Sequence, residues 1–192
     1  KGKDEEEMED KMSRIVLVTG GARSGKSTFA EELFRGRSDV VYLATARITD
    51  GEMKDRISLH RSRRPGEWET FEGNTNLKEA VGAAKHYLLD CITILTSNIM
   101  FDITGESENI SPEMQSEVEN RVVGEVYGLV EAVEAAGGDL VMVTNEVGDS
   151  IVPEHPVARA YRDIAGRVNQ RIAKRCNEVY LVVCGIPMRL KG

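Results

Sequence analysis

The residues from 20 to 27 combine glycines, a lysine and a serine in an order that binds phosphate groups. They read GGARSGKS, which satisfies G-x-x-x-x-G-K-[ST], and they follow an apolar run that is typical of a strand. Glycines let successive backbone N–H groups turn toward phosphate oxygens, and a following helix adds its positive dipole end. We expect Lys26 to contact the β- and γ-phosphates and Ser27 to ligate a bridging magnesium ion (Mg2+). The pattern predicts nucleoside triphosphate binding, although kinases, ATPases and switch proteins all share it.

A phosphate loop of this kind also needs a carboxylate at the end of a nearby strand to orient the magnesium ion. Asp90 ends the apolar run HYLLD, and Glu146 follows the run LVMVTN. Either carboxylate could instead cap a helix or pair with an arginine. The sequence pattern leaves both candidates open.

His60 is the histidine whose neighbours favour phosphate chemistry. Arg61, Arg63 and Arg64 follow it in a chain whose net charge is −7, so they would concentrate positive charge where a phosphate could bind. A neutral imidazole there can attack a phosphorus atom and form a phosphoramidate, which divides a nucleotidyl transfer into two displacements. The alternative is a surface histidine at the end of a solvated basic helix.

The elements that must position these residues alternate between β-branched apolar runs and helical stretches, which is the pattern of βαβ units. We therefore predict an α/β fold: a P-loop NTPase-like, three-layer domain with a mostly parallel central sheet flanked by helices. The expected strands cover 14–19, 40–45, 86–91, 140–144 and 179–184. The expected helices cover 26–35, 51–63, 77–84, 111–136 and 156–175, the fourth stopping at the Gly137-Gly138 pair. Residues 1–13 are expected to form a disordered acidic tail, and residues 14–192 a single domain.

Composition excludes several classes of protein. The net negative charge does not favour a nonspecific grip on nucleic acid. No stretch reaches the roughly 18 to 20 apolar residues that a membrane-spanning helix needs, and the acidic start does not look like a signal peptide. The three cysteines form no C-x-x-C pair, so reduced thiols and a cytoplasmic location are expected.

Several segments, in the same order along the chain, carry a family resemblance. They are VTGGARSGKS, the H-R-x-x-R-P-x-x-W segment that contains His60, LLDCITILTSN, VTNEVGDSIVP and VYLVVCGIPMRLK. Over residues 14–191 the chain resembles the bifunctional adenosylcobinamide kinase/adenosylcobinamide-phosphate guanylyltransferase family of P-loop enzymes. The phosphate loop is generic, but its combination with the histidine segment and VTNEVG is specific.

This resemblance implies both an activity and a set of site residues. The family phosphorylates adenosylcobinamide with a nucleoside triphosphate, GTP or ATP, and then transfers GMP from GTP to that phosphate through a GMP–histidine intermediate, here at His60. It also implies a homotrimer and favours Asp90 over Glu146 as the magnesium-side carboxylate. The implied nucleotide-binding residues are Gly20, Gly21, Ala22, Arg23, Ser24, Gly25, Lys26, Ser27, Ala44, Thr45, Ala46, Arg61, Ser62, Arg63, Arg64, Glu72 and Asp90.

One departure from the family pattern lies after VTNEVG. The chain has Asp149-Ser150 where the family commonly has a glycine before Ile-Val-Pro, and serine adopts positive φ less readily than glycine. The conformation of this loop is therefore open. Two other functions also remain open: a P-loop enzyme with only one of the two activities, and a nucleotide-dependent switch without turnover.

Overall fold

A computed structural model of the chain describes residues 12–47 and 66–192. Its centre is a sheet of seven strands in the order β3-β2-β4-β5-β1-β6-β7. All neighbouring pairs are parallel except β6 and β7, which form an antiparallel hairpin. The strands are β1 Ile15–Thr19, β2 Val40–Ala44, β3 Glu69–Glu72, β4 His86–Asp90, β5 Asp139–Val143, β6 Glu178–Val183 and β7 Ile186–Lys191.

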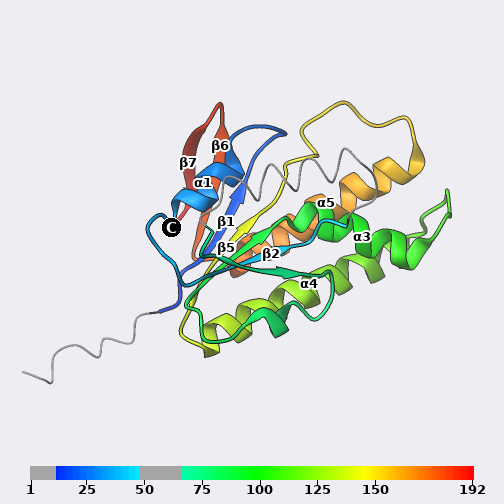
Figure 1. Ribbon diagram of the computed structural model, residues 1–192. Helices are drawn as coiled ribbons and strands as arrows, with labels where there is room; N and C mark the ends of the chain where they lie inside the picture. The colour runs from blue at the N-terminus through cyan, green and yellow to red at the C-terminus, as the bar shows by residue number, and fades with distance from the viewer. Residues whose placement is uncertain (1–11, 48–65) are drawn as a thin grey trace, which may run out of the picture.

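Helices cover both faces of this sheet, which gives three layers (Figure 1). They are α1 Lys26–Glu32, the 3-10 helix η1 Leu77–Ala80, α3 Ile92–Thr104, α4 Pro112–Ala135 and α5 Pro156–Arg175. Successive residues of a strand point to opposite faces, so Ile15 and Leu17 of β1 join the core beneath α3, α4 and α5. Val16 and Val18 join the second core, beneath α1. The predicted three-layer α/β fold is confirmed.

Residues at both ends of α4 explain where this helix begins and ends. Ser111 is the N-cap and accepts a hydrogen bond from the Met114 backbone N–H, and Pro112 opens the first turn. Beyond its last residue, Gly137 adopts φ 62°, a conformation that glycine reaches readily. The predicted stop at the glycine pair is therefore confirmed.

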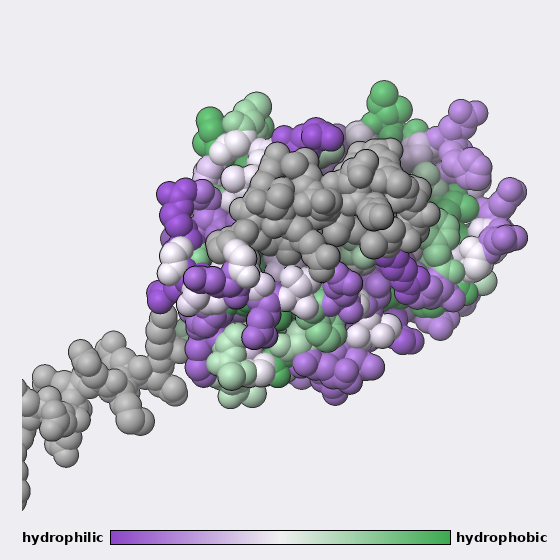
Figure 2. Space-filling view, viewed as in Figure 1, coloured by the Kyte–Doolittle hydropathy of each residue, from purple (hydrophilic) through white to green (hydrophobic). Residues whose placement is uncertain are grey.

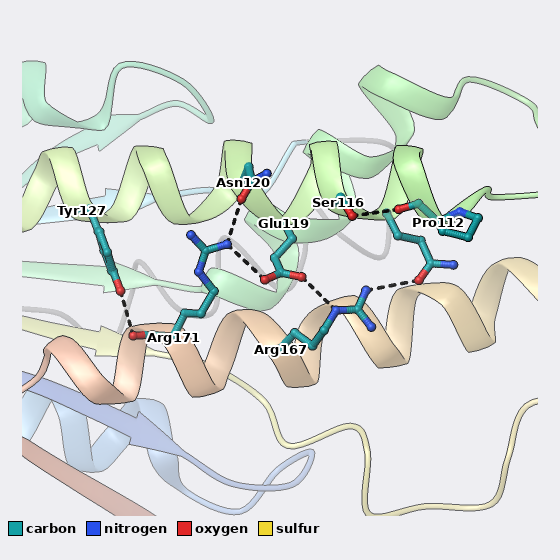
Figure 3. A network of polar contacts seen from close by, with 8 residues as sticks. Pro112, Ser116, Glu119, Asn120, Tyr127, Arg167 and Arg171 are labelled. Carbon is teal, nitrogen blue, oxygen red and sulfur yellow. Dashed lines mark hydrogen bonds and ion pairs between the residues drawn. The ribbon is translucent and has the colours of Figure 1, made fainter.

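Polar side chains hold α4 against α5 (Figure 3). The Glu119 carboxylate accepts hydrogen bonds from Arg167 Nε at 2.8 Å and from Arg171 Nη1 at 3.0 Å. Farther along, the Tyr127 hydroxyl donates to the Arg171 carbonyl at 2.9 Å. These contacts border the buried valines of α4, so the two longest helices pack as one layer.

The predicted elements differ from the observed ones in four places. The five expected strands and the helices expected at 26–35, 111–136 and 156–175 are present, with boundaries shifted by a few residues. The helix expected over 77–84 is wrong beyond Ala80, because Val81 is already extended with ψ 119°. The strands β3 and β7 and the helix α3 were not predicted. The helix expected over 51–63, like residues 1–11, lies outside the described residues.

Among the described helices, none is both long and apolar enough to cross a membrane.

Candidate active site

The phosphate loop connects β1 to α1 and is held by close backbone packing. Gly25 precedes the first residue of α1 with φ 94°, a region that favours glycine. A Cβ atom at Gly20 would lie 2.5 Å from the Val182 carbonyl oxygen of β6. The Gly185 N–H, in the turn between β6 and β7, donates to the Ser24 carbonyl at 2.8 Å. The β6–β7 hairpin therefore packs directly against the phosphate loop.

Lys26 is the first residue of α1, and its side chain folds back over the phosphate loop. It is 8% exposed, and its Nζ donates to the Gly21 carbonyl at 2.9 Å. Burial lowers the pKa of Lys26 below its ordinary value, while Cys91 and Asp90 act in the opposite direction. A bound polyphosphate would add countercharge beside this buried ammonium group.

The strand register aligns three of the predicted site residues. Ala44 at the end of β2 pairs with Glu72 at the end of β3 and with Asp90 at the end of β4. Because these strands are parallel to one another and to β1, their carboxyl ends lie at the same end of the sheet as the phosphate loop. The structure thus brings Glu72, Ala44 to Ala46 and Asp90 to the same end as residues 20–27.

Asp90 is half-buried and partly engaged by the protein. Its Oδ2 accepts a hydrogen bond from the Tyr42 hydroxyl at 2.9 Å, and its charge acts on Lys26. A serine hydroxyl and a carboxylate are hard oxygen ligands, which Mg2+ prefers together with substrate phosphates. Ser27 and Asp90 therefore fit a magnesium site of the kind the sequence predicts.

Asn98 of α3 supports the site and was not predicted from the sequence. Its Nδ2 donates to the Thr45 carbonyl at 2.8 Å, and Thr45 in turn donates from Oγ1 to the Cys91 carbonyl at 2.8 Å. The chain beyond β2 is therefore tied to the end of β4. Helical spacing of Ile92, Leu95 and Ile99 is the signal that could have located this helix.

Glu146, the other candidate carboxylate, lies after β5 and beside the phosphate loop. Its backbone N–H donates to the Gly20 carbonyl at 3.0 Å, and its side chain is exposed. Asp90 and Glu146 thus occupy different positions relative to the phosphate loop, one within the strand end and the other on the loop beyond β5.

His60 and the arginine segment that follows it lie outside the described residues, as does Ser62. Beyond β2, the described chain continues through Thr45 and Ala46 to Arg47.

A phosphate loop between β1 and α1, with carboxylates at the ends of parallel strands, defines a P-loop nucleotide-binding protein of the α/β class. A family model described as "Cobinamide kinase / cobinamide phosphate guanyltransferase" matches residues 16–190. The chain belongs to this family, and it is a transferase.

Curated relatives cover nearly the whole chain. The bifunctional adenosylcobalamin biosynthesis protein CobU of Escherichia coli (strain K12) is 44% identical over 181 residues, covering 92% of this chain and 99% of that protein. CobU of Salmonella typhimurium is 43% identical over 183 residues with the same two coverages. The bifunctional protein CobP of Pseudomonas aeruginosa is 38% identical over 181 residues, covering 92% and 96%.

Among solved structures, a KaiC-like protein, PH0186 from Pyrococcus horikoshii OT3, aligns with a TM-score of 0.46 and 14% identity. The alignment covers 88% of this chain and 71% of that chain.

Proposed function

We propose that this protein carries out both reactions of its family in succession. It phosphorylates the aminopropanol hydroxyl of adenosylcobinamide with a nucleoside triphosphate, and it then transfers GMP from GTP to the new phosphate. The products are adenosylcobinamide-GDP and pyrophosphate. The observation that carries the proposal is that the phosphate loop precedes α1 while Glu72 and Asp90 stand in register at the ends of neighbouring parallel strands of the same sheet.

For the kinase reaction, the nucleotide lies along residues 20–27. Backbone N–H groups of the loop bind the phosphates, and Lys26 neutralises the charge that shifts to the leaving oxygen. Ser27 and Asp90 would hold Mg2+, which supplies charge neutralisation at the β- and γ-phosphates. The phosphate loop binds the phosphates and does not contact the base, so both GTP and ATP could bind there.

For the guanylyl transfer, a neutral nitrogen of His60 attacks the α-phosphorus of GTP. The bond to the bridging oxygen breaks, and pyrophosphate leaves against Arg61, Arg63 and Arg64. The phosphate of adenosylcobinamide phosphate then attacks the same phosphorus and displaces the histidine. Glu72 and residues 44–46 border the nucleotide at the ends of β2 and β3.

Two further properties form part of the proposal. The protein is a homotrimer, which is supported by the apolar side chains of β7: Ile186, Met188 and Leu190 are all exposed. Figure 2 shows hydrophobic surface gathered over the β6–β7 hairpin at the upper left. The protein acts in the cytoplasm, where its nucleotide substrates are available and where its three free cysteines stay reduced.

Labelling with GTP that carries a radioactive α-phosphate tests the covalent step. We expect acid-labile label on the wild-type protein and none on His60→Ala, while His155→Ala, at the exposed N-cap of α5, labels normally. The His60→Ala protein should still phosphorylate adenosylcobinamide but form no GDP derivative. Equal labelling of wild type and His60→Ala would exclude His60 as the carrier of GMP.

A further inference from the structure

A second carboxylate lies beside the phosphate loop and has no part in the nucleotide site described above. The Glu146 N–H donates to the Gly20 carbonyl at 3.0 Å, and the preceding Thr144 N–H donates to the Val18 carbonyl at 2.9 Å. The backbone that carries Glu146 is therefore hydrogen-bonded to the end of β1 and to the start of the loop. Because β5 lies directly between β4 and β1, Glu146 emerges between Asp90 and the loop.

Side chains from two helices fix the residue before Glu146. The Asn145 backbone N–H and its Nδ2 both donate to Thr93 Oγ1 of α3, each at 2.8 Å. The Asn145 carbonyl accepts from Asn169 Nδ2 of α5 at 3.2 Å. These hydrogen bonds fix the first residues after β5, so the fold sets the backbone position of Glu146 even though its side chain is exposed.

The carboxylate itself faces outward. One oxygen accepts the Gly148 N–H at 3.3 Å, a long and weak hydrogen bond, and the residue is exposed. Asp90, in contrast, is half-buried and accepts a hydrogen bond from Tyr42. The two carboxylates therefore suit different tasks: Asp90 suits the metal and the nucleotide, and Glu146 suits a group that arrives from solvent.

We infer that Glu146 is the general base of the phosphoryl transfer, an inference that rests on the kinase half of the proposed function. The Glu146 carboxylate takes the proton of the substrate hydroxyl as its oxygen bonds to the γ-phosphorus. The bond from that phosphorus to the bridging oxygen breaks, and the nucleoside diphosphate leaves. A carboxylate that accepts the substrate's hydroxyl proton is the arrangement that kinase chemistry uses elsewhere.

The decisive variant is Glu146→Gln, which keeps the size of the side chain and an oxygen that can accept the Gly148 N–H. We expect kcat for diphosphate formation with adenosylcobinamide and ATP to fall by about 10²- to 10⁴-fold. The KM for ATP and the labelling of the protein by GTP should stay near wild-type values. Glu146→Asp should recover part of the lost kcat. Asp149→Asn removes one charge from the same exposed loop and should leave kcat unchanged.

The pH profile separates a base from a structural residue. The pH dependence of kcat should change shape in Glu146→Gln, which has no group to take the proton, whereas loss of a purely structural residue would leave the shape unchanged. A kcat within a factor of about three of wild type, or an equal loss of phosphorylation and of GTP labelling, would overturn the inference. A wild-type protein that labels with GTP but never phosphorylates adenosylcobinamide would overturn the kinase half of the proposed function as well.

Discussion

At Gly20 the phosphate loop runs directly against the main chain of β6. An added Cβ would lie 2.5 Å from the Val182 carbonyl oxygen and 2.7 Å from Ser24 Oγ. The first contact is with backbone, which cannot rotate away as a side chain can. The neighbouring Gly21 has open space around the same position, so the steric requirement changes completely between two adjacent glycines.

This contrast predicts different outcomes for two alanine substitutions. Gly20→Ala should lower the free energy of unfolding by about 1 to 3 kcal/mol, because the loop or β6 must shift to admit the methyl group. It should also weaken binding of a fluorescent GTP analogue by about tenfold or more. Urea titration and fluorescence measure the two effects.

Gly21→Ala serves as the comparison for folding stability, which should stay within about 0.5 kcal/mol of wild type. Equal destabilisation by the two substitutions would contradict the steric explanation.

At the scale of elements, one carboxylate contributes to the packing of α4 on α5. Burial tends to raise the pKa of Glu119, but hydrogen bonds from Arg167 and Arg171 outweigh it and hold the pKa below its ordinary value of 4.5. The ionised form is therefore favoured by folding. This contribution to stability is present above pH 4.5 and is lost as the pH falls through the lowered pKa.

Glu119→Gln should reduce the free energy of unfolding at pH 7 by about 1 kcal/mol, a modest value because both arginines are partly exposed. The difference from wild type should shrink as the pH is lowered below 4.5. Denaturant unfolding at a series of pH values measures both effects. Glu117→Gln, on the exposed side of the same helix, should have the stability of wild type at each pH. If the difference between Glu119→Gln and wild type grew on acidification, the stabilising role of the ionised Glu119 would be refuted.

At the scale of the whole molecule, β7 is an edge strand that exposes apolar side chains. Ile186 and Met188 share one face, opposite Val183 and Leu181 of β6, and both are exposed, as is Leu190. After a β-bulge near the end of the strand, Lys191 Nζ donates to the Cys176 carbonyl at 2.6 Å. An apolar, open edge is a surface that natural proteins normally cover, and the proposed homotrimer would cover it.

Light scattering tests this proposal through the mass of the particle. Wild-type protein should have about three times the 21.2 kDa of one chain. Met188→Lys should dissociate it, because a desolvated ammonium group in an apolar interface is costly. Met188→Leu keeps the apolar surface and should remain trimeric. A wild-type monomer would exclude the trimer, and a trimeric Met188→Lys protein would place the contact elsewhere.

Local patterns predicted much of the fold, and the failures have physical causes. The buried strands were recognisable because strands covered on both faces are continuously apolar. The β7 strand was not predicted; it contains Pro187, which an edge position makes acceptable in a strand. The α3 helix is rich in β-branched residues near its start, which weakened the helical signal although its buried positions follow helical spacing.

What the sequence determined by itself is the phosphate loop, because the groups that bind phosphate there are consecutive and their geometry is local. It also determined the family, through segments matched along nearly the whole chain. Only the tertiary structure decided that Ala44, Glu72 and Asp90 stand in register and that Glu146 is bonded to Gly20. These relations depend on hydrogen bonds between strands and loops far apart in the chain, and no local pattern encodes that register.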